Sequence, residues 1–421
     1  MSDGTIDAVP ATSSTPAPVP AATPTVPRRR DRWALIAVLG LMAGTAPLSI
    51  DMYIPGLPEM AQGFGVGDVA VQLTLTAFLL GLGIGQLLIG PLSDSRGRRT
   101  LLLAGTVGYI AFALLCAMAP SVGVLVAARF FQGLLGAAGV VLSRAVLADR
   151  FSTREAPRYF SYMAMVSGVA PVLAPLVGGV IVGLAGWRAV FGVLAGVGVV
   201  LLVGILAFVP ESLPPERRTA GGIRRSVAAM GRLAVRPSFL RYLAAGTFTA
   251  CALFAFISGA TFVFQEIYGL SPTGYGVMFG SSCVGMVCAG LAFGLLARRF
   301  AVDHLLRAGV LVALGGTLVL LVSRLCGVDG LAVAWISFAV FMIGMGTVTP
   351  AVITSLQREG ADTAGAASAL FGGAQFGIAA LATPIIGLLG SGVGALAGVC
   401  AAAMTLAATT LLTGRRVRAT R

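Results

Sequence analysis

The stretch GPLSDSRGRRTLLLAG, residues 90–105, has a counterpart in the second half of the chain, GLLARRFAVDHLLRAG, residues 294–309. Both stretches are bounded by glycine at the same spacing, and in both a basic turn is followed by a new apolar run. The shared apolar positions are Leu92, Leu101 and Leu102 in the first stretch and Leu296, Leu305 and Leu306 in the second. This self-similarity predicts a chain built from two related halves.

The composition places these halves in a lipid bilayer. Of the 421 residues, 57% are hydrophobic and only 11% are charged, whereas a soluble protein keeps about a quarter of its residues charged. The 57 glycines agree with this assignment, because small residues let transmembrane helices pack closely. We therefore expect an all-α membrane protein.

Apolar windows of about 20 residues, each long enough to cross ~30 Å of hydrocarbon as a helix, divide the chain into twelve predicted spans. Their expected starts are Trp33, Val71, Thr100, Val122, Tyr159 and Trp187 in the first half, then Phe239, Tyr275, Asp303, Leu331, Thr363 and Ser391 in the second. Six spans in each half predict two six-helix bundles related by a pseudo-two-fold axis along the membrane normal. A substrate site is expected between the bundles.

Arginine decides the predicted orientation, because the sequence contains no lysine. The loops on one side of the predicted membrane carry every arginine except Arg129, Arg144, Arg188 and Arg324. The positive-inside rule makes that side cytoplasmic, so we expect a multi-pass protein of the inner, cytoplasmic membrane with both termini inside. Topology also accounts for the net charge of +13, and we expect no nucleic-acid partner.

The segments outside the spans complete the predicted domain plan. Residues 1–32 are expected to form a disordered cytoplasmic tail, since 1–27 are rich in Pro, Ala and Thr without periodicity. They do not resemble a signal peptide, because the apolar stretch that follows is a full span. The N-terminal bundle is assigned to 33–209 and the C-terminal bundle to 239–413. A basic cytoplasmic linker at 210–238, in which a short surface helix can form, joins the bundles, and a basic cytoplasmic tail occupies 414–421.

Three classes of membrane protein compete for this sequence. A primary pump needs a nucleotide site, and its phosphate-binding loop requires a lysine, which this sequence lacks. An intramembrane enzyme should carry a metal cluster or a nucleophile constellation, whereas His304 is the only histidine and the six cysteines lack metal-ligand spacing. A secondary transporter needs only a cavity, a few intramembrane charges and two rocking halves. We therefore expect a transporter and not an enzyme, with no cofactor and no metal.

Several motifs resemble those of one transporter family. GPLSDSRGRR resembles the signature loop of the major facilitator superfamily, and RFFQGLLGAAG, from Arg129, resembles the fourth-span motif of its drug:proton antiporters. APVLAPLVGG, residues 170–179, is similar to the antiporter motif of span five, although Ala174 stands where glycine usually precedes the proline. SIDMYIPGLPEMA (49–61) and FISGATFVFQEIYGLSPTGYG (256–276) resemble the Bcr/CflA branch, which includes bicyclomycin and chloramphenicol exporters. The resemblance covers nearly the whole chain after the tail.

The signature loop predicts a conformational latch. Asp94 ends span two on the cytoplasmic side, where its carboxylate can accept hydrogen bonds from Arg98 or from a helix N-terminus in the other half. Gly97 permits the tight turn. The resemblance adds Asp149, at the end of span four, and implies that Asp94, Arg98 and Arg99 bias the outward-facing state. The alternative interpretation is a solvated loop that only sets topology.

Arg129 is the first of two charges inside predicted spans. It lies in the apolar run GVLVAARFFQGLLGAAG, where an arginine costs several kcal/mol unless it faces a wet cavity or a partner. Gln132 keeps the same helix face polar. The alternative is that Arg129 lies near the outer end of span four and extends to the interface.

Asp51 is the second charge, and it lies about 18 residues, or roughly 27 Å of helix, after Trp33. Pro47 should kink the helix and tilt this end toward the central cavity. A carboxylate that faces a cavity can take up and release a proton, as a proton carrier must. The family's acidic residue of span one occupies the matching place. The alternative is that Asp51 only marks the exit of span one, helped by Pro55 and Pro58.

Together these features predict an antiporter that exports a small antibiotic or amphipathic drug in exchange for protons, by alternating access. Proton coupling is assigned to Asp51 and Arg129, and the substrate cavity to Asp51, Tyr53, Arg129, Gln132 and Gln265. By resemblance, Pro175, Gly178 and Gly179 form an antiporter motif whose close packing prevents a leak. The expected partners are the drug, protons and the lipid bilayer, and the protein is expected to function as a monomer. The alternative function is proton-coupled import of a small nutrient or metabolite.

Overall fold

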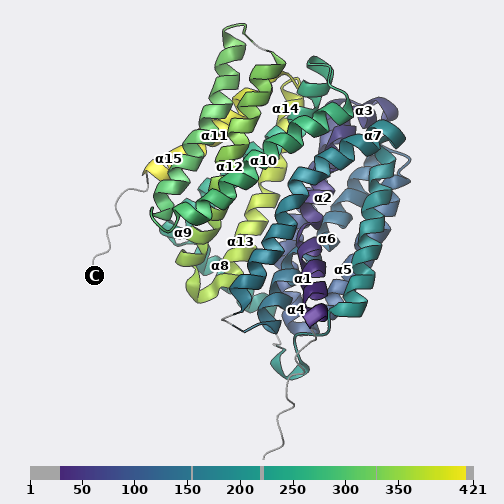
Figure 1. Cartoon of the computed structure of the whole chain (residues 1–421), viewed down its shortest axis with the longest axis vertical. Coiled ribbons are helices and arrows are strands. Elements are labelled where there is room, and N and C mark those ends of the chain that lie inside the picture. The colour runs from purple at the N-terminus through teal and green to yellow at the C-terminus, as the bar shows by residue number, and fades with distance from the viewer. Residues whose placement is uncertain (1–28, 153–154, 219–221, 329, 414–421) are drawn as a thin grey trace, which may run out of the picture.

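The computed structural model describes residues 29–152, 155–218, 222–328 and 330–413, and all regular elements within these ranges are helices (Figure 1). Most of the predicted tail at 1–32, and the predicted tail at 414–421, lie outside the described residues. The helix α1 begins at Arg29 rather than at Trp33. Residues 29–32 are therefore helical and do not belong to a disordered tail, since arginine is a strong helix former.

The first half of the chain forms one bundle, on the right of Figure 1. Its α4 and α5 both pack against α6, and α7 packs against α1 and α5. Its elements are α1 (Arg29–Ala43), α2 (Thr45–Asp51), η1 (Ile54–Gly56), α3 (Leu57–Phe64), α4 (Asp68–Arg96), α5 (Arg98–Ala117), α6 (Val122–Arg150) and α7 (Ala156–Phe208).

The second half forms the other bundle, on the left of Figure 1, in which α12 packs against α10 and α11, and α15 against α9 and α11. The linker holds a 3₁₀ turn, η2 (Pro215–Arg217), and the short helix α8 (Gly222–Ala234). The elements of the second bundle are α9 (Pro237–Phe262), the π-helical turn η3 (Val263–Ile267), α10 (Pro272–Leu296), α11 (Val302–Leu325), α12 (Leu331–Glu359), η4 (Ala361–Thr363), α13 (Ala364–Gly377), η5 (Ala379–Ala382), α14 (Thr383–Leu388) and α15 (Val393–Thr413).

Eleven helical segments among the described residues are long and apolar enough to cross a membrane, and one of them contains two of the twelve predicted spans. This segment, Arg158–Phe208, has 51 residues, or about 76 Å of helix, which is far longer than the ~30 Å hydrocarbon layer. Gly186 interrupts it with a φ of 76° and a ψ of 170°. Residues near both ends of α7, Tyr159 and Val209, belong to the same hydrophobic cluster. The chain therefore reverses at Gly186, directly before the predicted start of span six at Trp187.

Span one is broken in a way that places Asp51. The helix is interrupted at Gly44, between α1 and α2, because Pro47 has no N–H to donate to the carbonyl of Ala43. After Asp51 the chain continues through η1 and α3, and it turns at Gly65 with a φ of 65°. Asp51 is thus the last residue of a short helix deep in the bundle and not the last residue of a straight span.

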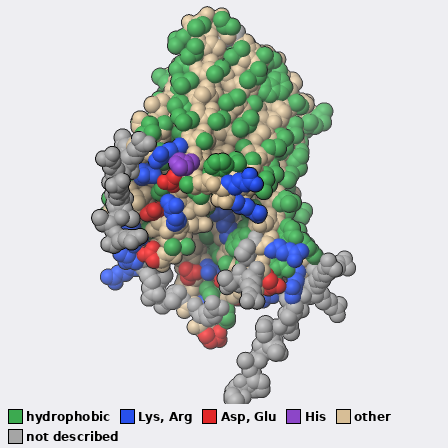
Figure 2. All heavy atoms as spheres, turned by 60° about the vertical axis from the view of Figure 1, so that its left-hand side comes forward, with side chains coloured by type: hydrophobic (Ala, Val, Ile, Leu, Met, Phe, Trp, Pro, Cys, Tyr) green, Lys and Arg blue, Asp and Glu red, His purple; other side chains and the backbone are tan. Residues whose placement is uncertain are grey.

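Charged side chains collect at one end of the molecule. Figure 2 shows hydrophobic side chains covering the upper part of the visible face, with arginine and acidic side chains gathered over the lower part. The starts of α1, α5 and α9 and the ends of α4, α6 and α12 lie at this lower end, which we call the arginine-rich side. Exposed apolar side chains between the two ends, such as Val200 and Leu291, suit contact with lipid.

Candidate functional site

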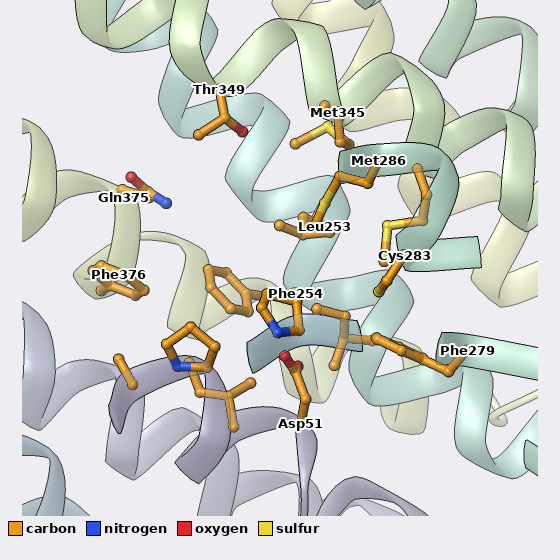
Figure 3. Close-up of a pocket in the computed structure, with 17 residues that line it drawn as sticks. Asp51, Leu253, Phe254, Phe279, Cys283, Met286, Met345, Thr349, Gln375 and Phe376 are labelled. Carbon is orange, nitrogen blue, oxygen red and sulfur yellow. The ribbon is translucent and has the colours of Figure 1, made fainter. Parts of the chain in front are cut away.

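A cavity of about 350 Å³ lies between the two halves of the molecule (Figure 3). Its wall is almost entirely apolar, with sulfur and aromatic side chains contributed by the second half. The lining residues are Ala46, Pro47, Ile50 and Asp51 from α2, Pro171 from α7, Leu253, Phe254 and Ile257 from α9, Phe279, Cys283 and Met286 from α10, Met342, Met345, Gly346 and Thr349 from α12, and Gln375 and Phe376 from α13.

Asp51 is the only acidic or basic side chain among these lining residues. In Figure 3 its carboxylate points from α2 into the cavity, with Phe254 of α9 and Cys283 of α10 across from it. The side chain is 7% exposed, and within the described part of the chain no hydrogen bond or ion pair holds its carboxylate. A carboxylate without a fixed protein partner can exchange a proton or a cationic group with the contents of the cavity.

Arg129 lies beside this cavity in a sealed aromatic box. It is fully buried on α6, and its guanidinium carbon lies 4.3 Å from the ring centroid of Tyr53 and 4.1 Å from that of Phe78. Its Nη1 donates to Oε1 of Gln132 at 2.8 Å, and its Nη2 donates to the carbonyl oxygen of Ser49 at 3.0 Å. Cation–π contacts and hydrogen bonds thus replace a carboxylate partner. Because Ser49 lies two residues before Asp51, Arg129 fixes the backbone that carries the carboxylate.

The structure places the predicted cavity residues at three different locations. Asp51 lines the cavity, whereas Tyr53, Arg129 and Gln132 lie in the aromatic box and are fully buried. Gln265 lies at the interface of the halves instead, where its Nε2 donates to the carbonyl of Pro55 at 2.9 Å. The apolar residues of the second half that form most of the wall were not distinguished by the sequence, because their side chains do not differ from ordinary packing residues.

Hydrogen bonds join the two halves on the side away from the arginines. Oγ1 of Thr261 donates to the carbonyl of Ile54 at 3.1 Å, and Oε1 of Gln72 accepts from the backbone N–H of Gly387 at 3.2 Å. The hydroxyl oxygens of Thr76 and Thr383 lie 2.5 Å apart. These contacts close this end of the interface above the cavity.

The glycines of the predicted antiporter motif belong to the same closed end. A Cβ on Gly178 would lie 2.0 Å from the carbonyl oxygen of Met52, the residue after Asp51, so α7 touches the backbone of span one there. A Cβ on Gly179 would lie 2.4 Å from the carbonyl oxygen of Pro272 at the start of α10. In return, a Cβ on Gly276 would lie 2.4 Å from the carbonyl oxygen of Pro175. The motif thus places spans five and eight in backbone contact across the halves.

A second cavity, about 500 Å³, separates the halves on the arginine-rich side. Asp94 of α4, Arg98 of α5 and Arg144 of α6 line it from the first half, and Ala364 and Ser368 of α13 line it from the second half. The interface between the halves is therefore closed at one end and hollow at the other, so this conformation opens toward the arginine-rich side.

Of the predicted latch residues, Asp94, Arg98 and Asp149 form one charge cluster within the first half. Nη1 of Arg98 lies 2.6 Å from Oδ1 of Asp94, and Nε of Arg98 donates to Oδ2 of Asp149 at 3.2 Å. Arg98 also donates to the hydroxyl of Ser93. Gly97 turns with a φ of 96°. Arg99 is oriented elsewhere, since its Nη2 donates to the carbonyl of Leu206 at 3.1 Å.

Glu211 is a member of this cluster that the sequence did not single out. Its carboxylate accepts the backbone N–H groups of Arg98 at 2.9 Å and Arg99 at 3.3 Å, which are the first two of α5, and those of Ser212 and Leu213 at 3.0 Å each. Partial burial alone would raise the pKa of Glu211, but these four donors hold that pKa below its usual value. The available signal was a carboxylate directly after span six, at the entrance of a basic linker.

Three comparisons relate the chain to known proteins. The sequence profile of the Major Facilitator Superfamily matches residues 39–384. The uncharacterized MFS-type transporter YdgK of Bacillus subtilis is 38% identical over 86% of this chain and 90% of that protein. A bicyclomycin resistance protein homolog of Haemophilus influenzae is 30% identical over 84% of this chain and 89% of that protein. A solved D-xylose-proton symporter, at 16% identity, shares the fold with a TM-score of 0.66 over 89% of this chain and 96% of that chain.

Proposed function

Because the chain belongs to the Major Facilitator Superfamily, and is therefore a membrane transporter with the predicted two-bundle fold, we propose that it exports a small amphipathic drug in exchange for protons. The observation that carries this proposal is Asp51, the one charged group that lines the apolar cavity of about 350 Å³, held by no partner within the described residues. The relative from Haemophilus influenzae is named a bicyclomycin resistance protein homolog, which supports an antibiotic as the exported compound.

The cavity favours neutral or positively charged amphipathic compounds. Its wall supplies aromatic rings and polarisable sulfur atoms, from residues such as Phe254, Phe279 and Met286, which suit flat apolar groups. Asp51 can receive a cationic or hydrogen-bonding group of the drug. An anionic drug would meet the carboxylate without any basic lining residue to compensate it.

The proposed cycle uses one site in two protonation states. When the cavity faces the outside, Asp51 takes up a proton. When the cavity faces the arginine-rich side, which we assign to the cytoplasm, the drug displaces that proton and is carried out as the halves rock. Arg129 acts in this scheme as a positioning residue, since it binds the carbonyl of Ser49 and makes no contact with the carboxylate of Asp51.

The latch and the glycine motif control which end of the interface is closed. In the present conformation Asp94 pairs with Arg98 in its own half and faces the start of α13 across the second cavity. We propose that closing this cavity brings Asp94 to the N-terminus of α13, where a helix end stabilises a carboxylate. The close contacts of Pro175, Gly178 and Gly179 seal the opposite end and prevent a proton leak. We further propose that the protein lies in the inner membrane with both termini in the cytoplasm and functions as a monomer.

Purified protein in proteoliposomes tests the proposal. Asp51→Asn keeps the shape of the side chain and removes its titration, so gradient-driven efflux should be lost, and adding drug to purified protein should no longer release protons. Asp68→Asn is the matched control, since it makes the same change at the start of α4, outside the cavity.

The same experiment separates export from import. The test compounds should include chloramphenicol and bicyclomycin. When protons flow from the side opposite the arginines to the arginine-rich side, an exporter should move these compounds in the opposite direction. Undiminished efflux by Asp51→Asn would exclude the carrier role of this carboxylate. Accumulation of substrate along the proton gradient would instead establish an importer.

A further inference from the structure

A third cavity, about 390 Å³, lies on the outside of the first bundle, away from the transport pathway. It is located where the start of α5, the end of α6 and the end of α7 meet α1 on the arginine-rich side. Two arginines, Arg99 and Arg150, line it together with apolar residues that include Leu35, Phe208 and Pro210. No acidic side chain is among the lining residues.

The two neighbouring arginines of the signature loop differ in how their charges are balanced. Arg98 lies between the carboxylates of Asp94 and Asp149. The guanidinium of Arg99 has only the carbonyl of Leu206 as a hydrogen-bond acceptor, and its Nε is buried without a partner within the described residues. Arg150 has no hydrogen bond or ion pair with any described residue. The cavity therefore presents two positive charges and several unused N–H donors.

The carboxylates of the two acidic residues that directly adjoin lining residues in the sequence, Asp149 and Glu211, are engaged elsewhere. Oδ2 of Asp149 accepts from Nε of Arg98 at 3.2 Å and from the hydroxyl of Ser212 at 3.0 Å. Glu211 accepts four backbone N–H groups and lies 3.7 Å from Nη2 of Arg218. Neither carboxylate is available to neutralise Arg99 or Arg150, so among the described residues the lining of the cavity is positively charged and suits an anion from outside the chain.

The cavity lies at the edge of the hydrocarbon layer. Phe208, one of its lining residues, is the last residue of the membrane-spanning segment of α7. Directly before it, Val200, Val203 and Leu206 are 63%, 59% and 55% exposed, and a spacing of three places these residues along one face of the helix. An acyl chain can lie along this face while the headgroup reaches the two arginines.

We propose that this cavity binds the phosphate group of an anionic phospholipid from the leaflet on the arginine-rich side. The phosphate oxygens accept hydrogen bonds from Arg99 and Arg150, and the acyl chains pack along the exposed face of α7. A guanidinium pair suits a phosphate because each group presents a planar fork of donors. Bound lipid would join the start of α5 to the ends of α6 and α7, next to the latch.

The test is a lipid titration of the full purified chain in detergent, followed by native mass spectrometry and by the midpoint of thermal unfolding. Phosphatidylglycerol and phosphatidylcholine with identical acyl chains are the probes, and inorganic phosphate is a third. We expect saturable binding and stabilisation by phosphatidylglycerol. Removing both arginines should weaken this binding ~30-fold, and removing one should weaken it about 5-fold, if each contributes as a basic residue does at an anionic membrane surface.

The variants are Arg99→Gln combined with Arg150→Gln, and Arg150→Gln alone, which changes an exposed side chain and should leave folding intact. The matched control combines Arg298→Gln with Arg299→Gln, two exposed arginines in the loop between α10 and α11. An equal loss of phosphatidylglycerol binding in both double variants would show unspecific charge attraction and overturn the proposal. So would unchanged binding after loss of Arg99 and Arg150, or equal stabilisation by inorganic phosphate, which would indicate a simple ion site.

Discussion

Gly178 lies where α7 crosses the end of α2, and replacing it with alanine should force the two helices apart. The added Cβ would lie 2.0 Å from the carbonyl oxygen of Met52, 2.7 Å from its carbonyl carbon and 2.9 Å from its Cα. These are backbone atoms, which cannot rotate away as the end of a side chain can. A tolerable separation of 3.0 Å requires a helix shift of about 1 Å, and overpacking of this kind costs roughly 1–3 kcal/mol.

The shift should also change transport, because Met52 directly follows Asp51. Moving the end of α2 displaces the carboxylate relative to the cavity wall and loosens the closed end of the interface. We expect Gly178→Ala to lower the free energy of unfolding and to raise the proton leak of proteoliposomes. Gly178→Leu should have the same effects more severely.

Gly168→Ala is the matched control, because it makes the same substitution in the same helix at a position where nothing lies within 4 Å of the added Cβ. There the methyl group removes backbone freedom from the unfolded chain, and the change should stabilise the protein by about 0.5–1 kcal/mol. The assay is thermal and denaturant unfolding in detergent, with proton flux measured in parallel. If Gly178→Ala matched Gly168→Ala in stability and remained tightly coupled, backbone contact between α7 and α2 would be the wrong explanation of this motif.

Three further variants test the charges. Asp94→Asn should reach the membrane yet lose most of its transport, because the balance between the two conformational states changes, while the free energy of unfolding falls by less than about 1 kcal/mol because the Asp94 side chain is 40% exposed. Asp362→Asn, which breaks a pair with Arg236 at the start of α9, should transport normally. Transport by Asp94→Asn at the wild-type rate would exclude the latch. The lowered pKa of Glu211 means that its stabilising effect is complete above the unfolded value, about 4.5, and is lost as the pH falls toward the folded one. The unfolding midpoint of Glu211→Gln should therefore lie below that of the wild type at pH 6 and approach it as the pH falls below 4.5. A difference that stays constant with pH would contradict the capping role. Arg129→Lys should lower the free energy of unfolding by roughly 2 kcal/mol, since an ammonium group cannot make both buried hydrogen bonds of the guanidinium. Arg298→Lys at the surface should change the unfolding midpoint little. Equal midpoints for the two variants would argue against the aromatic box.

The sequence predicted the helical membrane fold well, because the bilayer imposes the pattern directly. Each span must hide its backbone in a helix about 20 residues long, and that requirement is visible in the apolar windows. The reversal at Gly186 falls directly before the predicted start of span six at Trp187. The helix of span one begins before the predicted start at Trp33, since Arg29 to Arg32 continue it beyond the apolar window.

The candidate site was predicted less completely. A lone charge in an apolar span must be stabilised by a cavity or by protein partners, but the sequence does not show which of the two it has. The sequence analysis assigned both Asp51 and Arg129 to a wet central cavity. The structure places Asp51 at the cavity and closes Arg129 among Tyr53, Phe78 and Gln132. The difference depends on which neighbours α2, α4 and α6 bring together.

The sequence by itself determined that this chain crosses a membrane as helices in two related halves, and which side carries the arginines, because hydrophobic length and charge are local properties of each segment. Only the tertiary structure decided that Asp51 faces a cavity with no partner among the described residues, that Glu211 caps α5, and that Arg99 turns away from the latch toward the end of α7. These outcomes depend on contacts between residues far apart in the chain. Such contacts arise when helices pack at particular angles, and no single segment contains that information.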